Sequence, residues 1–274
     1  MRTVDATVQQ PVKPLTPDPW SSLRRHTSAR IALGRAGGSL PTAGVLGFAM
    51  DHALARDAVH SELDLDATEE SLRPLGLPVI RLQTQATDRL TYLQRPDLGR
   101  RLEDASRAAL GSSPRTSHAP DVALIVADGL SALAAARHAG AVLQALVPQL
   151  RSTGFTLAPL ALVRHGRVAV QDEIGTALGV KLAVILIGER PGLGTPDSLG
   201  AYLVFDPKPG VRSDADRNCV SNIRPVGLPP PAAAQTLLYL ITESLRRRIS
   251  GVSLKDEREP LPAPGRETGL MEGQ

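Results

Sequence analysis

Residues 181–187 read KLAVILI and lead directly into the glycine-rich segment GERPGLG at 188–194. This run is the most β-like in the chain, because branched aliphatic side chains favour an extended backbone. It is continuously apolar rather than alternating, which is typical of a strand that is buried on both faces of a parallel sheet. A second run of the same kind, VALIVA, occupies 122–127. Together the two runs predict a parallel sheet at the centre of the fold.

The segments around these runs alternate between strand-like and helix-like patterns. Further strands are predicted at 155–163 and 202–205, and helices at 131–150, 172–178 and 231–250. Strands that alternate with helices predict an α/β fold with a doubly wound, mostly parallel, Rossmann-like sheet. The sequence before this part predicts a helical N-terminal region, with helices at 21–34, 42–60 and 95–107. The resulting division is a flexible leader at 1–19, the helical region at 20–115, an α/β domain at 116–254 and a disordered tail at 255–274.

Composition excludes several classes of protein. The formal net charge is only +3 and aromatic residues make up 3% of the chain, so neither a basic face nor stacking platforms for nucleic acid are expected. A single cysteine cannot form an intrachain disulfide, and a reducing cytoplasm is the natural compartment. No apolar run has the roughly 18 residues needed to cross a bilayer. We therefore expect an intracellular protein that binds neither nucleic acid nor membrane.

The turns after the predicted strands are the first candidates for a ligand site, because ligands bind at the carboxyl ends of strands in open parallel sheets. The turn DGLS at 128–131 offers a helix start and a hydroxyl to a polar ligand, with plain turn and cap chemistry as the alternative. The three glycines and the proline of the segment at 188–194 favour an ordered loop with a specific backbone conformation. The segment lacks both the P-loop and the dinucleotide pattern. In it, Glu189 could accept hydrogen bonds from amide groups of a large ligand, or pair with a cation such as Arg190.

A third polar segment, DRNCVSN at 216–222, contains the lone cysteine, Cys219. A free cysteine is most often a small buried hydrophobe, although a ligand contact remains open. No histidine and acid lie near it in the sequence, so a covalent nucleophile is not predicted. The segment VRHGRV at 163–168 is consistent with phosphate binding or with a solvated hairpin. The histidines show no metal-ligand spacing, so no metal site is predicted.

When these segments are taken together, the chain resembles the small subunit of the adenosylcobalamin-dependent ethanolamine ammonia-lyase family from about residue 20 to about residue 254. The resemblance rests on motifs in the same order: LRRHTSARIALGRAG (23–37), DHALARDAV (51–59), YLQRPDLGRRL (92–102), VADGLS (126–131), VRHGRV (163–168), ALGVKLAVILIGERPGLG (177–194) and DRNCVSNI (216–223). No single motif would be sufficient, but such an ordered series is specific.

The resemblance implies a two-chain enzyme that converts ethanolamine to acetaldehyde and ammonia with adenosylcobalamin held between this chain and a large subunit. It implies no catalytic residue on this chain, because the family's substrate contacts lie on the large subunit. It places the cobalamin contacts at Val168 in GRV, Glu189 in GERPGLG and Cys219 in DRNC. Val168 suits the apolar rim of a corrin, and Glu189 suits its peripheral amides. The D-x-H-x-x-G pattern that supplies a histidine to cobalt is absent, so no protein ligand to the metal is expected.

The family also implies a higher hetero-oligomer, in either the cytoplasm or a bacterial microcompartment. The leader is shorter than the extension that directs relatives into such compartments, which leaves encapsulation open. Two other classes stay as alternatives. One is a non-catalytic structural partner without ligand contacts, and the other is a stand-alone α/β nucleotide-binding or hydrolytic enzyme, because fold alone does not fix function.

Overall fold

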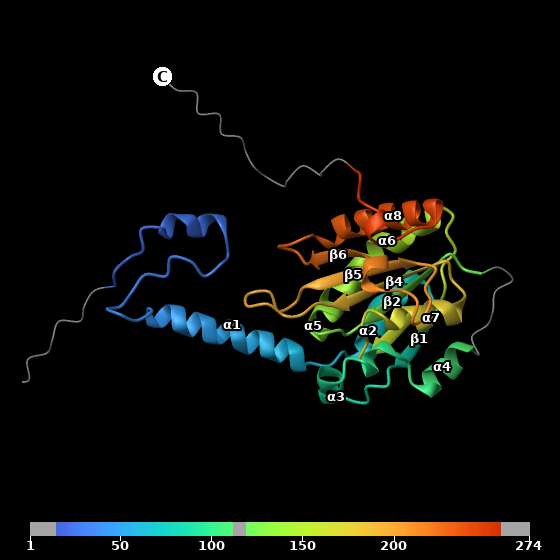
Figure 1. Ribbon diagram of the computed structural model, residues 1–274, viewed down its shortest axis with the longest axis horizontal. Coiled ribbons are helices and arrows are strands. Elements are labelled where there is room, and N and C mark those ends of the chain that lie inside the picture. The colour runs from blue at the N-terminus through green and yellow to red at the C-terminus, as the bar shows by residue number, and fades with distance from the viewer. Residues whose placement is uncertain (1–14, 112–118, 259–274) are drawn as a thin grey trace, which may run out of the picture.

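The computed structural model describes residues 15–111 and 119–258, and it consists of an α/β body with a long N-terminal arm (Figure 1). The body contains one six-stranded sheet in the order β1-β3-β2-β4-β5-β6. The strands are β1 (Val79–Gln83), β2 (Val122–Ala127), β3 (Leu160–Arg164), β4 (Leu182–Gly188), β5 (Leu199–Phe205) and β6 (Asn218–Ile223). The first four in this order are parallel, whereas β5 and β6 are antiparallel to their neighbours. The predicted α/β class with a mostly parallel sheet is confirmed.

The α-helices cover both faces of this sheet and form the arm (Figure 1). They are α1 (Thr42–His60), α2 (Leu65–Leu72), α3 (Arg89–Gln94), α4 (Asp104–Gly111), α5 (Ala132–Ala134), α6 (Gly140–Ser152), α7 (Val170–Leu178) and α8 (Pro230–Arg247). A π-helical segment, Ala135–Ala139, joins α5 to α6. Short 3₁₀ turns lie at Ser21–His26, Arg73–Leu75, Leu98–Arg100, Asp214–Asp216 and Gly251–Ser253.

The alternation of side chains along each central strand divides the core into two clusters. On β2, Leu124 packs with α6 and α8 on one face, whereas Ile125 packs with α7 on the other. Every residue of β2 and β4 is buried, as the continuous apolar runs predict. Because strand side chains point alternately to opposite faces, a run without polar residues requires helices on both sides.

The region 20–115, predicted as helical, also contains the strand β1, which pairs in parallel with β3. Three expectations for secondary structure are wrong. The predicted helix at 21–34 is only the 3₁₀ turn Ser21–His26, and the helix predicted at 95–107 begins at Asp104. The polar segment expected as a turn at 216–222 is largely the edge strand β6. The domain boundaries stay predictions, and most of the leader at 1–19 and of the tail at 255–274 lies outside the described residues.

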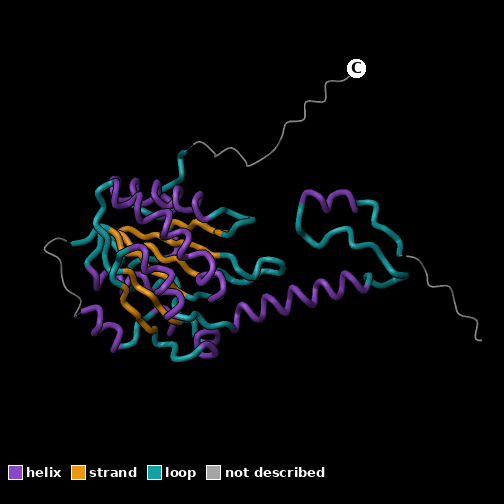
Figure 2. Tube along the Cα trace, turned by 180° about the vertical axis from the view of Figure 1, so that it is seen from behind, coloured by secondary structure: helices purple, strands orange, loops and turns teal. Residues whose placement is uncertain are grey.

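The arm projects away from the body, and Figure 2 shows the same separation from behind. Helix α1 is 19 residues long, yet only Ala58 near its body end is buried. The preceding segment folds back along α1, where Arg30 pairs with Asp51 and lies over the ring of Phe48. The large apolar side chains that remain exposed on the described part of the arm are Leu15, Trp20, Leu23, Ile31, Leu40, Val45, Leu46, Phe48, Met50 and Leu54.

Candidate functional site

Three polar turns meet at the carboxyl edge of the parallel strands, immediately after β2, β3 and β4. They begin at Asp128, His165 and Glu189. The first and the third turns touch through their backbones, since the amide of Leu130 donates to the carbonyl of Gly188 at 2.9 Å. A Cβ at Gly129, whose φ is +59°, would lie 2.3 Å from the same carbonyl oxygen. Glycine is therefore required here for a close backbone approach.

The buried carboxylate of Asp128 orders the second turn. It accepts hydrogen bonds from the amides of His165 at 2.9 Å and Gly166 at 3.0 Å, and Arg89 lies 3.5 Å away. Burial raises the pKa of this carboxyl group, although the amides and Arg89 oppose the rise. These bonds fix the start of the segment that carries Val168. Sequence reasoning noticed Asp128 only as part of a turn, because its partners lie far away in the chain.

The hydroxyl of Ser131 serves the helix cap and the neighbouring loop. It accepts from the amide of Ala134 at 3.2 Å, which is the N-cap interaction, and donates to the carbonyl of Pro196 at 2.8 Å. Both interactions are internal to the protein. Ser131 is therefore the cap of the helix, as the alternative of turn and cap chemistry predicts, while Leu130 of the same turn faces the hollow described next.

A hollow of about 200 Å³ opens between the second and third turns. Its lining combines apolar and charged groups: Tyr92, Leu130, Arg167, Val168, Ile187, Gly188, Glu189, Arg190 and Tyr202. The structure thus brings the predicted residues Val168 and Glu189 to one hollow. The segment 163–168 is neither a hairpin nor fully solvated, because β3 ends at Arg164 within it, the following residues form the turn before α7, and His165 is buried.

The carboxylate of Glu189 is held by residues of the β4–β5 loop and of β6. The hydroxyls of Ser198 and Ser221 each donate to it at 2.5 Å, and the amide of Asn222 donates at 3.3 Å. No contact with Arg190 appears among these described partners, so the predicted pairing with that cation is not what holds the side chain. Among the described residues Oε1 accepts only from Ser221, although a carboxylate oxygen can accept two hydrogen bonds.

Cys219 lies beside the hollow rather than in its lining. It is exposed on β6 and stands opposite Tyr202 of β5, which does line the hollow. Burial raises the pKa of Tyr202, and the neighbouring Cys219 and Glu189 raise it further. Although the residue is exposed, the protein around its sulfur withdraws the Cys219 thiol partly from water, and this desolvation raises its pKa, while a hydrogen bond with Tyr202 opposes the rise. The absence of a covalent role stays a prediction.

Sequence reasoning missed the two tyrosines that line the hollow, and it noticed Arg167 only within VRHGRV as a candidate for phosphate binding. Tyr92 is fully buried, and the guanidinium groups of Arg89 and Arg167 lie 4.9 and 4.3 Å from its ring centroid. The only available signal was the motif YLQRPDLGRRL, which carries Tyr92 without indicating a site. Among the described residues, no group of three or more His, Cys, Asp or Glu side chains is arranged to hold a metal ion.

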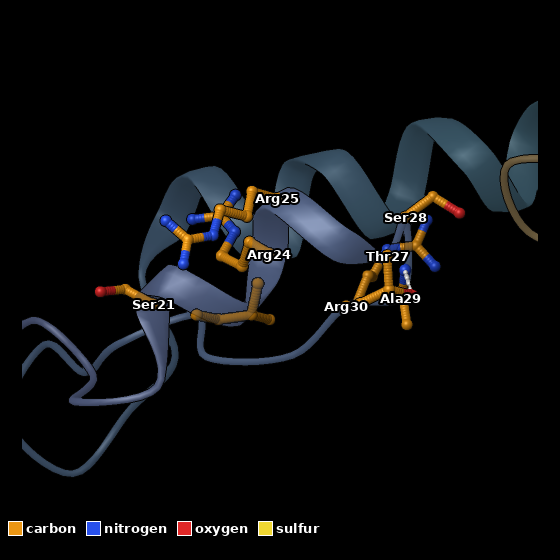
Figure 3. Close-up of a pocket in the computed structure, with 8 residues that line it drawn as sticks. Ser21, Arg24, Arg25, Thr27, Ser28, Ala29 and Arg30 are labelled. Carbon is orange, nitrogen blue, oxygen red and sulfur yellow. Dashed lines mark hydrogen bonds between the residues drawn. The ribbon is translucent and has the colours of Figure 1, made fainter. Parts of the chain in front are cut away.

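A second hollow, of about 490 Å³, lies on the arm and has a basic lining (Figure 3). Arg24, Arg25 and Arg30 line it together with Ser21, Thr27 and Ser28. Arg25 is engaged with His26 at 3.0 Å, and Arg30 pairs with Asp51. None of the predicted site residues belongs to this hollow, so it is separate from the site at the sheet edge.

The chain is thus a mixed α/β protein with a half-open hollow at the carboxyl edge of its parallel strands, where this class of fold binds ligands. The family model of the ethanolamine ammonia-lyase light chain (EutC) matches residues 17–255. A relative from Azotobacter vinelandii, named ethanolamine ammonia-lyase small subunit, is 54% identical over 93% of this chain and 95% of its own length. A relative of the same name from Ralstonia nicotianae is 51% identical over 94% of this chain and 96% of its own. The chain therefore belongs to the ethanolamine ammonia-lyase light-chain family.

The family assignment confirms the resemblance that the ordered motifs indicate, and it makes this chain a subunit of a lyase. The name small subunit implies a larger partner chain. Across residues 15–111 and 119–258, no helix is both long and apolar enough to span a membrane.

Proposed function

We propose that this chain is the small subunit of an adenosylcobalamin-dependent ethanolamine ammonia-lyase and that it holds one side of the cofactor at the sheet-edge hollow. The observation that carries the proposal is the meeting of Val168 and Glu189 in one hollow, with Cys219 adjoining it across Tyr202. These three positions are the ones that the family resemblance assigns to cobalamin.

The residues present suit the edge of a corrin. Leu130, Val168 and Ile187 offer apolar contact, while Glu189 and Arg167 offer an acceptor and a donor to peripheral amides. A hollow of about 200 Å³ is too small to enclose such a ligand, since pockets for drug-sized molecules have roughly 300–1,000 Å³. The proposed cofactor must therefore be covered on its other side by a second chain.

In this proposal the protein residues bind and orient, and adenosylcobalamin supplies the radical chemistry when it is bound. Glu189 keeps its carboxylate in place through Ser198 and Ser221 and accepts an N–H from the ligand. Val168 and Cys219 contribute close, uncharged contacts, and the raised pKa of the thiol keeps it neutral. The residues that contact ethanolamine belong to the large subunit, so no catalytic residue is assigned to this chain.

The proposed partner is supported by the arm. Met50 and Leu46 are 62% and 63% exposed on a helix that the body covers only at its end. Exposed apolar side chains gathered on one projecting element are typical of a protein interaction surface. We propose that the large subunit covers them in a higher hetero-oligomer in the cytoplasm, with microcompartment location as the alternative.

The test is acetaldehyde release from ethanolamine and adenosylcobalamin, measured with this chain alone, with the large subunit alone, and with both. Activity only in the mixture is the expected result, and no activity in any of the three would contradict the proposal. Cofactor affinity of the mixture, measured with Glu189→Gln and Cys219→Ala, then separates the alternatives. If neither substitution changes the affinity while the chains still assemble, the chain is a structural partner without ligand contacts.

A further inference from the structure

Arg167 lines the sheet-edge hollow, and contacts with Tyr92 fix its side chain. Its guanidinium carbon lies 4.3 Å from the ring centroid of Tyr92, and its Nη2 donates to the Tyr92 carbonyl at 3.2 Å. Its backbone amide donates to the carbonyl of Gly99 at 2.7 Å. A Cβ at Gly99 would stand 2.8 Å from Cγ of Arg167, so the absence of a side chain there leaves room for the arginine.

Tyr92 is a rigid support for this arginine. It is fully buried, and its hydroxyl donates to the carbonyl of Gly166 at 3.1 Å. The guanidinium of Arg89 also lies over the Tyr92 ring, and it is 3.5 Å from the carboxylate of the buried Asp128. Arg167 has no ion pair with any described carboxylate, and its buried Nε has no hydrogen-bond partner among the described residues. An unpaired buried donor destabilises a folded chain, and Nη2 of Arg89 over the same ring is likewise unpaired among the described residues. The group that can reach a ligand is the rest of the Arg167 guanidinium, because Arg167 lines the hollow.

The lining of the hollow identifies the chemical group that would use this cation. Arg167 supplies donors, and Glu189, which lines the same hollow, supplies an acceptor. A primary amide presents one carbonyl oxygen and one NH₂ group, which match these two residues. A phosphate presents acceptors alone, and the Glu189 carboxylate would repel it.

We propose that Arg167 donates a hydrogen bond to the carbonyl oxygen of a peripheral primary amide of the bound corrinoid, while Glu189 accepts from an amide N–H. The inference rests on the proposed function and adds a ligand-contacting residue to it. Tyr92 acts as a positioning residue, because it holds the guanidinium where the ligand edge would lie.

The experiment measures the dissociation constants of adenosylcobalamin and adenosylcobinamide for the assembled two-chain complex by visible absorbance. Adenosylcobinamide keeps the corrin amides but lacks the nucleotide phosphate. The variants are Arg167→Gln, Arg167→Lys and the matched control Arg164→Gln, which removes an exposed arginine of the same motif. Thermal unfolding and co-purification with the large subunit establish that each variant folds and assembles.

Loss of a charge-assisted hydrogen bond predicts that Arg167→Gln weakens binding of both corrinoids by about 10- to 100-fold. The lysine variant should lose less, because it keeps the charge without the planar fork. If Arg167→Gln fails to assemble, the affinities measured with Arg167→Lys are compared with those of Arg164→Gln instead. Equal affinities for Arg167→Gln and Arg164→Gln would overturn the inference and leave the proposed function intact. A loss confined to adenosylcobalamin would overturn the amide assignment in favour of the phosphate. No binding to the unaltered complex would overturn the proposed function itself.

Discussion

The buried ion pair between Asp172 and Arg217 joins α7 to the strand that carries Cys219. Arg217 donates from Nη1 to Oδ1 at 3.0 Å and from Nη2 to Oδ2 at 2.7 Å, which is a two-point contact. The two side chains are only 3% and 1% exposed. Arg217 directly precedes β6, so we expect Asp172→Ala to weaken both the fold and the position of Cys219.

The size of the effect follows from burial. Removing one member of a buried pair leaves the other charge uncompensated and costs about 3–5 kcal/mol. For a domain of this size each kcal/mol lowers the melting temperature by about 2–4 °C, so the fall should be about 6–20 °C. Replacing both residues, as in Asp172→Leu with Arg217→Met, should cost less than Asp172→Ala alone, because no charge is left without a partner.

The measurement is urea unfolding of dilute chain followed by far-ultraviolet circular dichroism for the single and double variants. Asp97→Ala, which removes an exposed carboxylate that pairs with the exposed Arg95, is the control and should cost much less. A loss below about 1 kcal/mol for Asp172→Ala would show that this pair behaves like a surface salt bridge, and the reasoning from burial would be refuted.

Three further predictions concern the backbone, the thiol and the arm. Gly129→Ala should lower the melting temperature by more than Gly179→Ala. Both positions have positive φ, but only a Cβ at Gly129 would lie 2.3 Å from a carbonyl oxygen, that of Gly188. Equal losses would contradict the close approach. Because its pKa is raised, Cys219 has a smaller thiolate fraction than a free cysteine at any given pH. At pH 8, iodoacetamide should therefore alkylate Cys219 more slowly than it alkylates free cysteine. The rate for Cys219 should begin to rise at a higher pH than the rate for free cysteine; matching pH profiles would exclude a raised pKa. The double change Leu46→Lys and Met50→Lys should raise the soluble yield of the chain alone and reduce its co-purification with the large subunit. The control Leu90→Lys, at an exposed leucine off the arm, should leave co-purification unchanged, and equal effects would remove the arm as the interface.

The sequence was most informative about the centre of the sheet. A continuous apolar run cannot be placed at a surface, so β2 and β4 could be predicted from composition alone. The edge strands β1 and β6 were missed, because VIRLQ and NCVSNI mix polar and apolar residues and each has a solvated side. Half-polar strands of this kind resemble loops until their neighbours in the sheet are known.

The candidate site was predictable in part for a similar reason. Glu189 directly follows the most apolar strand, so the topology rule places it at the carboxyl edge. Its meeting with Val168 joins the turns after β3 and β4, which lie on either side of β2 at that edge. By contrast, the contact between Tyr92 and Arg167 joins residues 75 positions apart in the chain. No local pattern encodes such a contact, because it depends on how the segment between β1 and β2 packs against the turn after β3.

The loop between β4 and β5 is fastened at both of its ends. Near its start, Glu189 is held by Ser198 and Ser221, and near its end Asp197 contacts Arg137 at 3.0 Å and His138 at 3.3 Å. Ordering a free backbone segment upon binding costs about 1–2 kcal/mol per residue. A loop that folding has already ordered spares the ligand this entropic cost, so a few contacts at its rim can yield useful affinity. The glycine-rich segment would thus meet the proposed cofactor as an ordered, preorganised surface.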